Sequence, residues 1–202
     1  MKLKFARLIK RLLLLMLLSF GAVTAYVLYL VVVDNFHVVS PGRVYRSRQM
    51  SSRALARVIP ECGIKTILNL RGENGSSSWY RAETNTAGQL IVKHFDFALS
   101  AGREVTDPEI ENILTIIRTS PKPVLIHCQA GADRTGLISA LYLYGIEGKA
   151  ADEAGRELSI RYGHFPYLFW GNTGAMDYSF RRYVSNHANH AKSSLPPQAA
   201  SP

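Results

Sequence analysis

The residues best suited to do chemistry lie together between positions 127 and 136, in the order His-Cys-Gln-Ala-Gly-Ala-Asp-Arg-Thr-Gly. The apolar stretch 123–127 predicts a short buried strand, and residues 136–146 predict a helix. A loop between a strand and a helix can direct successive backbone N–H groups toward one point, and the helix N-terminus adds partial positive charge there. The segment therefore predicts a binding site for an anion.

The side chains of this loop suit a phosphate and a nucleophile. Beside the N–H groups and the helix end, we expect the thiol of Cys128 to be ionised at neutral pH and therefore nucleophilic. Arg134 lies six residues later, where its planar guanidinium can bind two phosphate oxygens. Gly131 permits backbone geometry that a Cβ atom would obstruct, and Thr135 can donate its hydroxyl to the sulfur. The predicted phosphate-binding residues are Gln129, Ala130, Gly131, Ala132, Asp133 and Arg134.

These residues resemble the signature of a known enzyme family. The pattern H-C-x5-R-[ST] of the cysteine-dependent phosphatases, the protein tyrosine and dual-specificity superfamily, is matched by His127, Cys128, Arg134 and Thr135. The stretches 42–47 and 64–71 also look like the start of such a domain, so the resemblance covers about residues 40–162. It implies a dual-specificity-phosphatase-like fold and a phosphoric monoester hydrolase that forms a phosphocysteine intermediate. It implies neither a metal nor another cofactor.

The resemblance also implies a general acid, because the family uses an aspartate roughly thirty residues before the cysteine to protonate the leaving oxygen. Asp96 lies 32 residues before Cys128, close to the end of a stretch that predicts a strand, and is the first candidate. Asp133 is the alternative, since some members of the superfamily carry an aspartate directly before the arginine. His127 and Thr135 are implied as auxiliary residues.

Arg71 stands at the exit of another predicted strand. It either contacts the substrate phosphate or pairs with a carboxylate of the loop.

The N-terminal segment has the composition of a membrane anchor. Residues 1–11 carry five Lys or Arg and no acid, and residues 12–33 carry no charge. As a helix, residues 12–33 are about 33 Å long, which covers a hydrocarbon core of ~30 Å. We predict a single-pass transmembrane helix with its N-terminus inside, in the inner membrane of a bacterium. The alternative is a cleaved signal peptide, because residues 23–25 offer a possible cleavage site.

Residues 34–184 predict one α/β phosphatase domain, because strand-like and helix-like stretches alternate along them. Such alternation indicates a single, mainly parallel sheet flanked by helices. The expected strands are 43–46, 64–70, 91–97 and 123–127, and the expected helices are 51–59, 79–87, 106–120, 136–146 and 150–162. Pro60 is expected just past the end of its helix.

Residues 185–202 predict a disordered tail, because they are rich in Ala, Ser, Asn and Pro. His187 and His190 within it lack a third partner, so no metal site is predicted.

Composition excludes several function classes. The chain has 202 residues and a formal net charge of +9, but five of its positive charges lie in the first 11 residues. The basic excess is therefore local, and no nucleic-acid partner is predicted. Two cysteines are too few for a disulfide-rich scaffold or a four-cysteine zinc site.

The loop chemistry indicates a phosphomonoester substrate without naming the alcohol. The predicted anchor and the aromatic and arginine residues between 161 and 183 favour a phospholipid headgroup, such as that of phosphatidylglycerophosphate. The same aromatic residues are otherwise the core of the last helices. A membrane-tethered protein tyrosine or dual-specificity phosphatase is the close alternative. A non-catalytic phosphate-binding adaptor is a distant one, because such adaptors usually lose the cysteine or the arginine.

Overall fold

The computed structural model describes residues 2–166 and 172–193. Its strands are β1 (His37–Ser40), β2 (Val44–Ser47), β3 (Thr66–Asn69), β4 (Lys93–Asp96) and β5 (Val124–His127). Its helices are α1 (Lys2–Val32), α2 (Ser52–Cys62), α3 (Ser78–Gln89), α4 (Asp107–Thr119), α5 (Asp133–Gly145), α6 (Ala151–Ala154) and α7 (Gly174–Ser193). Two short 3₁₀ helices follow α6, namely η1 (Gly155–Glu157) and η2 (Ile160–Tyr162).

The five strands form one sheet in the order β1-β2-β5-β3-β4. Strand β1 pairs antiparallel with β2, and the other neighbours are parallel. The predicted mainly parallel sheet is therefore confirmed. Strand β1 was not predicted, because four residues at a partly exposed edge carry little apolar periodicity. The order places β5, which leads into the candidate loop, at the centre of the sheet.

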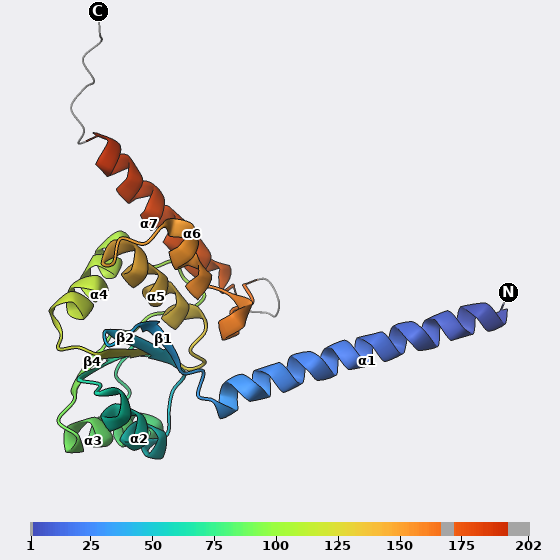
Figure 1. The fold of residues 1–202 in the computed structure, drawn as a ribbon, viewed down its shortest axis with the longest axis horizontal. Coiled ribbons are helices and arrows are strands. Elements are labelled where there is room, and N and C mark those ends of the chain that lie inside the picture. Colours follow the sequence, from blue (N-terminus) through green and yellow to red (C-terminus); the bar gives the residue numbers. More distant parts are fainter. Residues whose placement is uncertain (1, 167–171, 194–202) are drawn as a thin grey trace, which may run out of the picture.

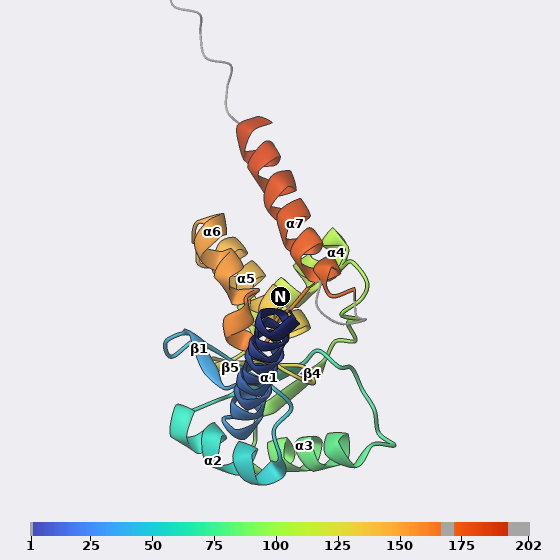
Figure 2. The same cartoon turned by 90° about the vertical axis from the view of Figure 1, so that its right-hand side faces the viewer.

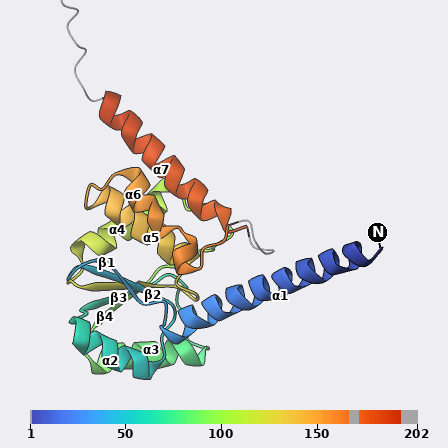
Figure 3. The same ribbon diagram turned by 45° about the vertical axis from the view of Figure 1, so that its right-hand side comes forward.

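Helices cover both faces of the sheet (Figures 1 and 3). Helices α2 and α3 lie on one face, and α4, α5, α6 and α7 lie on the other. Alternating strand residues supply the two cores: Ile67 and Leu125 pack with the α2 side, whereas Leu68 and Ile126 pack with the α5 side. Because strand side chains alternate between faces, both faces of β3 and β5 are buried, which keeps the sheet edge beside the loop rigid.

Two local predictions need correction. Pro60 lies inside the last turn of α2, because the helix continues to Cys62 and is capped by Gly63, which has a left-handed φ of 64°. The expected single helix at 150–162 is broken into α6, η1 and η2. In a continuous helix the carbonyl of Glu157 would accept from a backbone N–H four residues later, but it accepts from Arg46 Nη1 instead.

The C-terminal part of the chain is more ordered than expected. Residues 185–193 continue α7 as a helix, and residues 194–202 lie outside the described residues. Contacts with α4 stabilise this polar helix: Asn186 donates to Asp107 at 2.8 Å, and Tyr183 donates to Glu111 at 2.6 Å. No group of three potential metal ligands occurs among the described residues.

Helix α1 projects from the domain with most of its surface exposed (Figures 1 and 2). Its part from Arg7 to Val32 has a mean hydropathy of 2.2 and is long and apolar enough to cross a membrane, by length and composition. Near its C-terminal end α1 contacts the domain. Leu30 is buried there, and the Tyr26 hydroxyl donates to the carbonyls of Ile160 and Arg161 at 3.1 and 2.7 Å.

Candidate active site

The carboxyl ends of three parallel strands bring the predicted site residues to one edge of the sheet. Asn69, the last residue of β3, pairs with Asp96 of β4 on one side and with His127 of β5 on the other. Cys128 follows His127 directly. Because neighbouring strands lie about 4.8 Å apart, the backbones of Asp96 and His127 are separated by two such spacings, or about 10 Å. The sheet register thus brings the candidate acid and the candidate nucleophile to the same edge.

Donors from outside the loop hold the backbone that follows β5. The carbonyl groups of residues 129–132 are all held by donors from outside the loop. These donors are the Gln49 N–H at 3.2 Å, Asn35 Nδ2 at 3.0 Å, and Arg46 Nη2 at 2.7 and 3.3 Å. Because N–H and C=O point in opposite directions across a trans peptide, the N–H groups of residues 130–133 point into the loop. Inward N–H groups are what the predicted anion-binding nest requires.

A buried ion pair between Arg46 and Glu157 supports the loop, because Arg46 also donates to the loop carbonyls. Arg46 is fully buried, and its Nη1 lies 2.5 Å from the Glu157 carboxylate. Its Cζ lies 3.8 Å from the centroid of the Tyr162 ring. Burial lowers the pKa of Arg46 below its usual value, and the Glu157 charge opposes that shift. Gly131 packs against the end of β2 with a φ of +72°, and a Cβ atom there would approach the Ser47 backbone to 2.6 Å. The loop therefore has little room to move.

The first turn of α5 carries two buried polar atoms with no hydrogen-bond partner in the described part of the chain. They are Nε of Arg134 and Oγ1 of Thr135. Nη1 of Arg134 donates to the carbonyls of Leu70 and Leu99 at 3.3 and 3.1 Å, which fixes the guanidinium. Its edge formed by Nε and Nη2 has the geometry that binds two phosphate oxygens. Cys128 is buried, and the predicted hydrogen bond from Thr135 to its sulfur is not formed here.

His127 is held by a buried carboxylate that the sequence did not reveal. Oε1 of Glu83 lies 3.0 Å from Nε2 of His127 and 2.8 Å from Nε2 of His94, and Gln49 donates to Oε2 at 2.5 Å. Burial raises the pKa of Glu83, but the hydrogen bonds from His127, His94 and Gln49 outweigh it and lower that pKa to about 2. A charged Glu83 therefore fixes the ring of His127, the residue that precedes Cys128.

The two candidate acids have different surroundings. Asp96 accepts from Asn69 Nδ2 at 2.7 Å and from the Tyr80 hydroxyl at 2.5 Å. Asp133 lies 2.6 Å from Nδ1 of His164, whose Nε2 lies 2.9 Å from Asp177. Burial disfavours the cationic ring, but the two carboxylates raise the pKa of His164 to about 9. Asp133 is therefore paired with a cation, whereas Asp96 accepts hydrogen bonds from two neutral donors and lies 3.6 Å from Nδ1 of His94.

The match to known proteins agrees with this geometry. A model of the tyrosine phosphatase family matches residues 30–151, which is more than half of the chain. The chain belongs to the tyrosine phosphatase family. The dual specificity protein phosphatase TpbA of Pseudomonas aeruginosa is 28% identical to it over 116 residues, which make up 56% of this chain and 48% of TpbA. The chain thus spans about half the length of this curated relative.

Solved structures of phosphatases share the fold. The crystal structure of P. aeruginosa TpbA superposes with a TM-score of 0.60 at 22% identity, covering 80% of this chain and 92% of that one. The crystal structure of PTPMT1 superposes with a TM-score of 0.55 at 13% identity, covering 76% and 99%. The predicted α/β fold, a sheet flanked by helices, is therefore shared with these phosphatases.

Arg71 of this family member lies beside the loop. Its guanidinium stacks on the ring of Trp79, 3.6 Å from Cζ to the centroid, and donates to Gln49 at 3.2 Å. Burial and the neighbouring charge of Arg134 lower the pKa of Arg71, and the charge of Cys128 opposes this shift. The structure thus brings a second arginine near Arg134 and Cys128. The predicted ion pair with a loop carboxylate is not present among the described residues.

Most of the supporting residues of this tyrosine phosphatase domain were missed from the sequence. They are Asn35, Arg46, Glu83, Glu157 and His164. Each acts through a contact with a residue more than 30 positions away, which no local motif encodes. Arg46 carried no distinct signal either, because Arg43 and Arg48 flank it in the sequence.

Three of the described aromatic residues between 161 and 183 belong to the core. Tyr162, Phe180 and Tyr183 are buried, whereas Tyr178 is 52% exposed. Residues 167–171, which include Phe169 and Trp170, lie outside the described residues. The described part of the segment therefore gives little support to an aromatic membrane patch.

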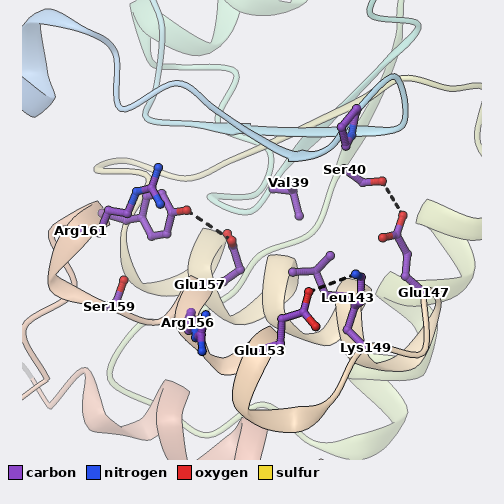
Figure 4. Close-up of a pocket in the computed structure, with 12 residues that line it drawn as sticks. Val39, Ser40, Leu143, Glu147, Lys149, Glu153, Arg156, Glu157, Ser159 and Arg161 are labelled. Carbon is purple, nitrogen blue, oxygen red and sulfur yellow. Dashed lines mark hydrogen bonds and ion pairs between the residues drawn. The ribbon is translucent and has the colours of Figure 1, made fainter.

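A pocket of about 540 Å3 lies between the end of β1 and the η1–η2 segment (Figure 4). Glu157, the partner of Arg46, is among its lining residues. Lys149, Arg156 and Arg161 mix there with acidic side chains, and Lys149 pairs with Glu153. Because Cys128 and Arg134 are not among its lining residues, this pocket is separate from the phosphate loop.

Proposed function

We propose that the chain is a membrane-anchored, cysteine-dependent phosphomonoester phosphatase. Its substrate would be the phosphorylated headgroup of a phospholipid, such as phosphatidylglycerophosphate, and it would use no cofactor. The observation that carries the phosphatase assignment is the loop at 129–134. Outside donors hold the carbonyl groups of this loop, Cys128 is buried directly before it, and Nε of Arg134 at its end is buried without a hydrogen-bond partner among the described residues.

In the first step, the thiolate of Cys128 attacks the phosphorus atom. A phosphorus–sulfur bond forms while the bond from phosphorus to the substrate oxygen breaks. The N–H groups of the nest and the guanidinium of Arg134 bind the equatorial oxygens, whose negative charge must be stabilised in the transition state. Arg71 is proposed to add positive charge at the same side of the substrate.

A proton donor is needed for the leaving oxygen. We assign this role to Asp96, which would give its proton to the departing alkoxide and then take a proton from the water that hydrolyses the phosphocysteine. The sulfur leaves as a thiolate, and inorganic phosphate is released. Asp133 is the alternative donor, but its pairing with the cationic His164 favours a carboxylate that holds α5 in place.

Helix α1 supports the proposed lipid substrate. Its apolar length suits a membrane span, and its last turns contact the domain next to the phosphate loop. An enzyme held in this way would work at the surface of the bilayer, in the single-pass inner-membrane location predicted above.

A membrane-tethered protein tyrosine or dual-specificity phosphatase is the second candidate. It is favoured by the relative TpbA, a dual specificity protein phosphatase that has also been crystallised as a Cys→Ser variant in complex with phosphotyrosine.

The decisive experiment measures phosphate release by the full chain in vesicles. The substrates, compared side by side, are phosphatidylglycerophosphate, a phosphotyrosine peptide and a soluble aryl phosphate. We expect turnover of the lipid and of the aryl phosphate, with no loss in EDTA. Cys128→Ser should remove all turnover because a serine hydroxyl is hardly ionised at neutral pH, and Cys62→Ser is the matched control. Activity retained by Cys128→Ser would overturn the covalent mechanism, and activity on the peptide alone would replace the lipid by a protein substrate.

A further inference from the structure

An apolar groove separates α1 from the phosphate loop. It has a volume of about 370 Å3, and Val23, Val27 and Leu30 of α1 line one side of it. The opposite side includes Ala130 of the loop and Phe165. The groove is therefore a junction between the apolar helix and the backbone that is proposed to hold the substrate phosphate.

A second cavity extends the groove toward the N-terminus of α1. It has a volume of about 620 Å3 and shares Val23 and Phe165 with the first cavity. Ala22, Tyr26 and Ile160 also line it. From Val23 to Leu30 the groove follows the helix for about 10 Å at ~1.5 Å per residue.

Specific contacts keep the two walls of the groove in place. The Tyr26 hydroxyl donates to the carbonyls of Ile160 and Arg161, and Leu30 packs against Gly163, where an added Cβ atom would lie 3.1 Å from a Leu30 methyl group. These contacts hold α1 at a fixed distance from the domain, so the groove is a defined feature of the fold.

The groove changes from polar to apolar along its length. Arg48 and Gln129 line it together with the phosphate loop, whereas its extension along α1 is lined mainly by aliphatic and aromatic side chains. A molecule with an anionic phosphate at one end and hydrocarbon at the other matches this gradient. A peptide would bury backbone N–H and C=O groups against the apolar part without partners, which is costly.

We propose that this groove binds an acyl chain of the phospholipid whose headgroup phosphate is hydrolysed at Cys128. This inference rests on the proposed function. Residues 22–30 form the last part of the segment expected to span the membrane, next to the bilayer surface, so the open side of the groove would meet lipid there and an acyl chain could enter sideways. The chain's own anchor would then form one wall of its substrate site.

The test compares full-length variants in phosphatidylcholine vesicles. Val27→Trp fills the groove, and Leu28→Trp is the matched control, because Leu28 is 58% exposed and is not among the groove-lining residues. The probes are dioleoyl phosphatidylglycerophosphate, its dihexanoyl analogue and a soluble aryl phosphate.

We expect Val27→Trp to lower the ratio of kcat/KM for the dioleoyl lipid to that for the aryl phosphate by about tenfold, since lost burial of a few methylene groups corresponds to this factor. The dihexanoyl ratio should fall less, and Leu28→Trp should leave both ratios within about twofold.

An unchanged dioleoyl ratio in Val27→Trp would overturn the groove while leaving the proposed lipid phosphatase intact. If the wild type hydrolyses the aryl phosphate but none of the lipid, both the groove and the proposed lipid substrate are overturned. If Val27→Trp lowers all three activities equally, the substitution has disturbed the loop. The groove is then tested with Val23→Trp, which lies one helical turn further from the loop. A dioleoyl ratio that is unchanged in Val23→Trp then overturns the groove.

Discussion

The nucleophile side and the acid side of the candidate site are held in different ways. The loop after Cys128 is fixed by donors from β2, from the segment after it and from the turn after α1, and part of it is buried. Asp96 lies at an exposed sheet edge and is held by side-chain hydrogen bonds from Asn69 and Tyr80. Donors that stabilise the charge of the transition state must keep their positions during the reaction. A proton donor, in contrast, must adapt to leaving groups of different shape and basicity. Changes on the nucleophile side should therefore act equally on all substrates, and changes on the acid side should not.

Arg134→Lys should give the largest effect and test the first half of this comparison. A lysine keeps the charge but cannot bind two oxygens in one plane, so kcat should fall on the order of 10²–10³-fold. The fall should be similar for alkyl and aryl phosphates, measured by phosphate release. Arg53→Lys on the exposed side of α2 is the control and should be unchanged. Near-normal rates in Arg134→Lys would remove this residue from the site.

Asp96→Asn tests the second half of the comparison, namely that a change on the acid side acts differently on different substrates. A general acid contributes about 10²–10⁴-fold when the leaving group is poor, so hydrolysis of an alkyl phosphate should slow by at least about 10²-fold. An aryl phosphate with an acidic leaving group should slow far less, and the basic limb of the kcat profile against pH should disappear. Asp133→Asn is the comparison variant. If only Asp133→Asn depends on the leaving group, the loop aspartate is the donor.

The pH dependence of stability should reveal the His164 cluster that supports the nucleophile side. The pKa of His164 is raised to about 9 in the folded chain, against about 6.5 when unfolded. Its protonated form therefore stabilises the fold fully below about pH 6.5, and this contribution is lost as pH rises through 9. Urea titrations should measure the free energy of unfolding of wild type and of His164→Gln at pH 6 and at pH 10. The loss caused by the substitution should be larger at pH 6 than at pH 10 by on the order of 3 kcal/mol. A pH-independent difference would contradict a charged His164.

Truncation of α1 should give the smallest effect on chemistry. Deleting residues 1–21 leaves the contacts of Tyr26 and Leu30, so kcat/KM on a soluble aryl phosphate should stay within about twofold, while the protein should leave the membrane fraction. Deleting residues 1–33 removes both contacts and should lower Tm by several degrees. Mass spectrometry of the wild-type N-terminus checks the anchor itself, because cleavage near residues 23–25 would identify a signal peptide instead.

The central part of the site could be predicted because its chemistry is local in sequence. The strand, the loop from His127 to Thr135 and the following helix are contiguous, and the structure brings these elements together as the sequence indicated. The parallel strands were also predictable, since β3 and β5 are apolar and buried on both faces.

The rest could not be predicted because it depends on tertiary contacts. Glu83 lies 44 positions from His127, and Arg46 lies 111 positions from Glu157. Neither pair has a sequence signature, although each fixes a residue of the loop or its strand. Helix α7 was missed because its polar composition hides contacts with Asp107 and Glu111 that only the fold creates.

The turn after α1 joins this apolar helix to the candidate loop. Asp34 and Asn35 adopt left-handed φ values of 54° and 42° there, and Asn35 is buried with its amide bound to the carbonyls of Ala130 and Tyr162 at 3.0 and 2.9 Å. In an anchored enzyme this turn would set the height of the loop above the bilayer. The enzyme would then measure headgroup length, because only a phosphate carried at that height could reach the sulfur.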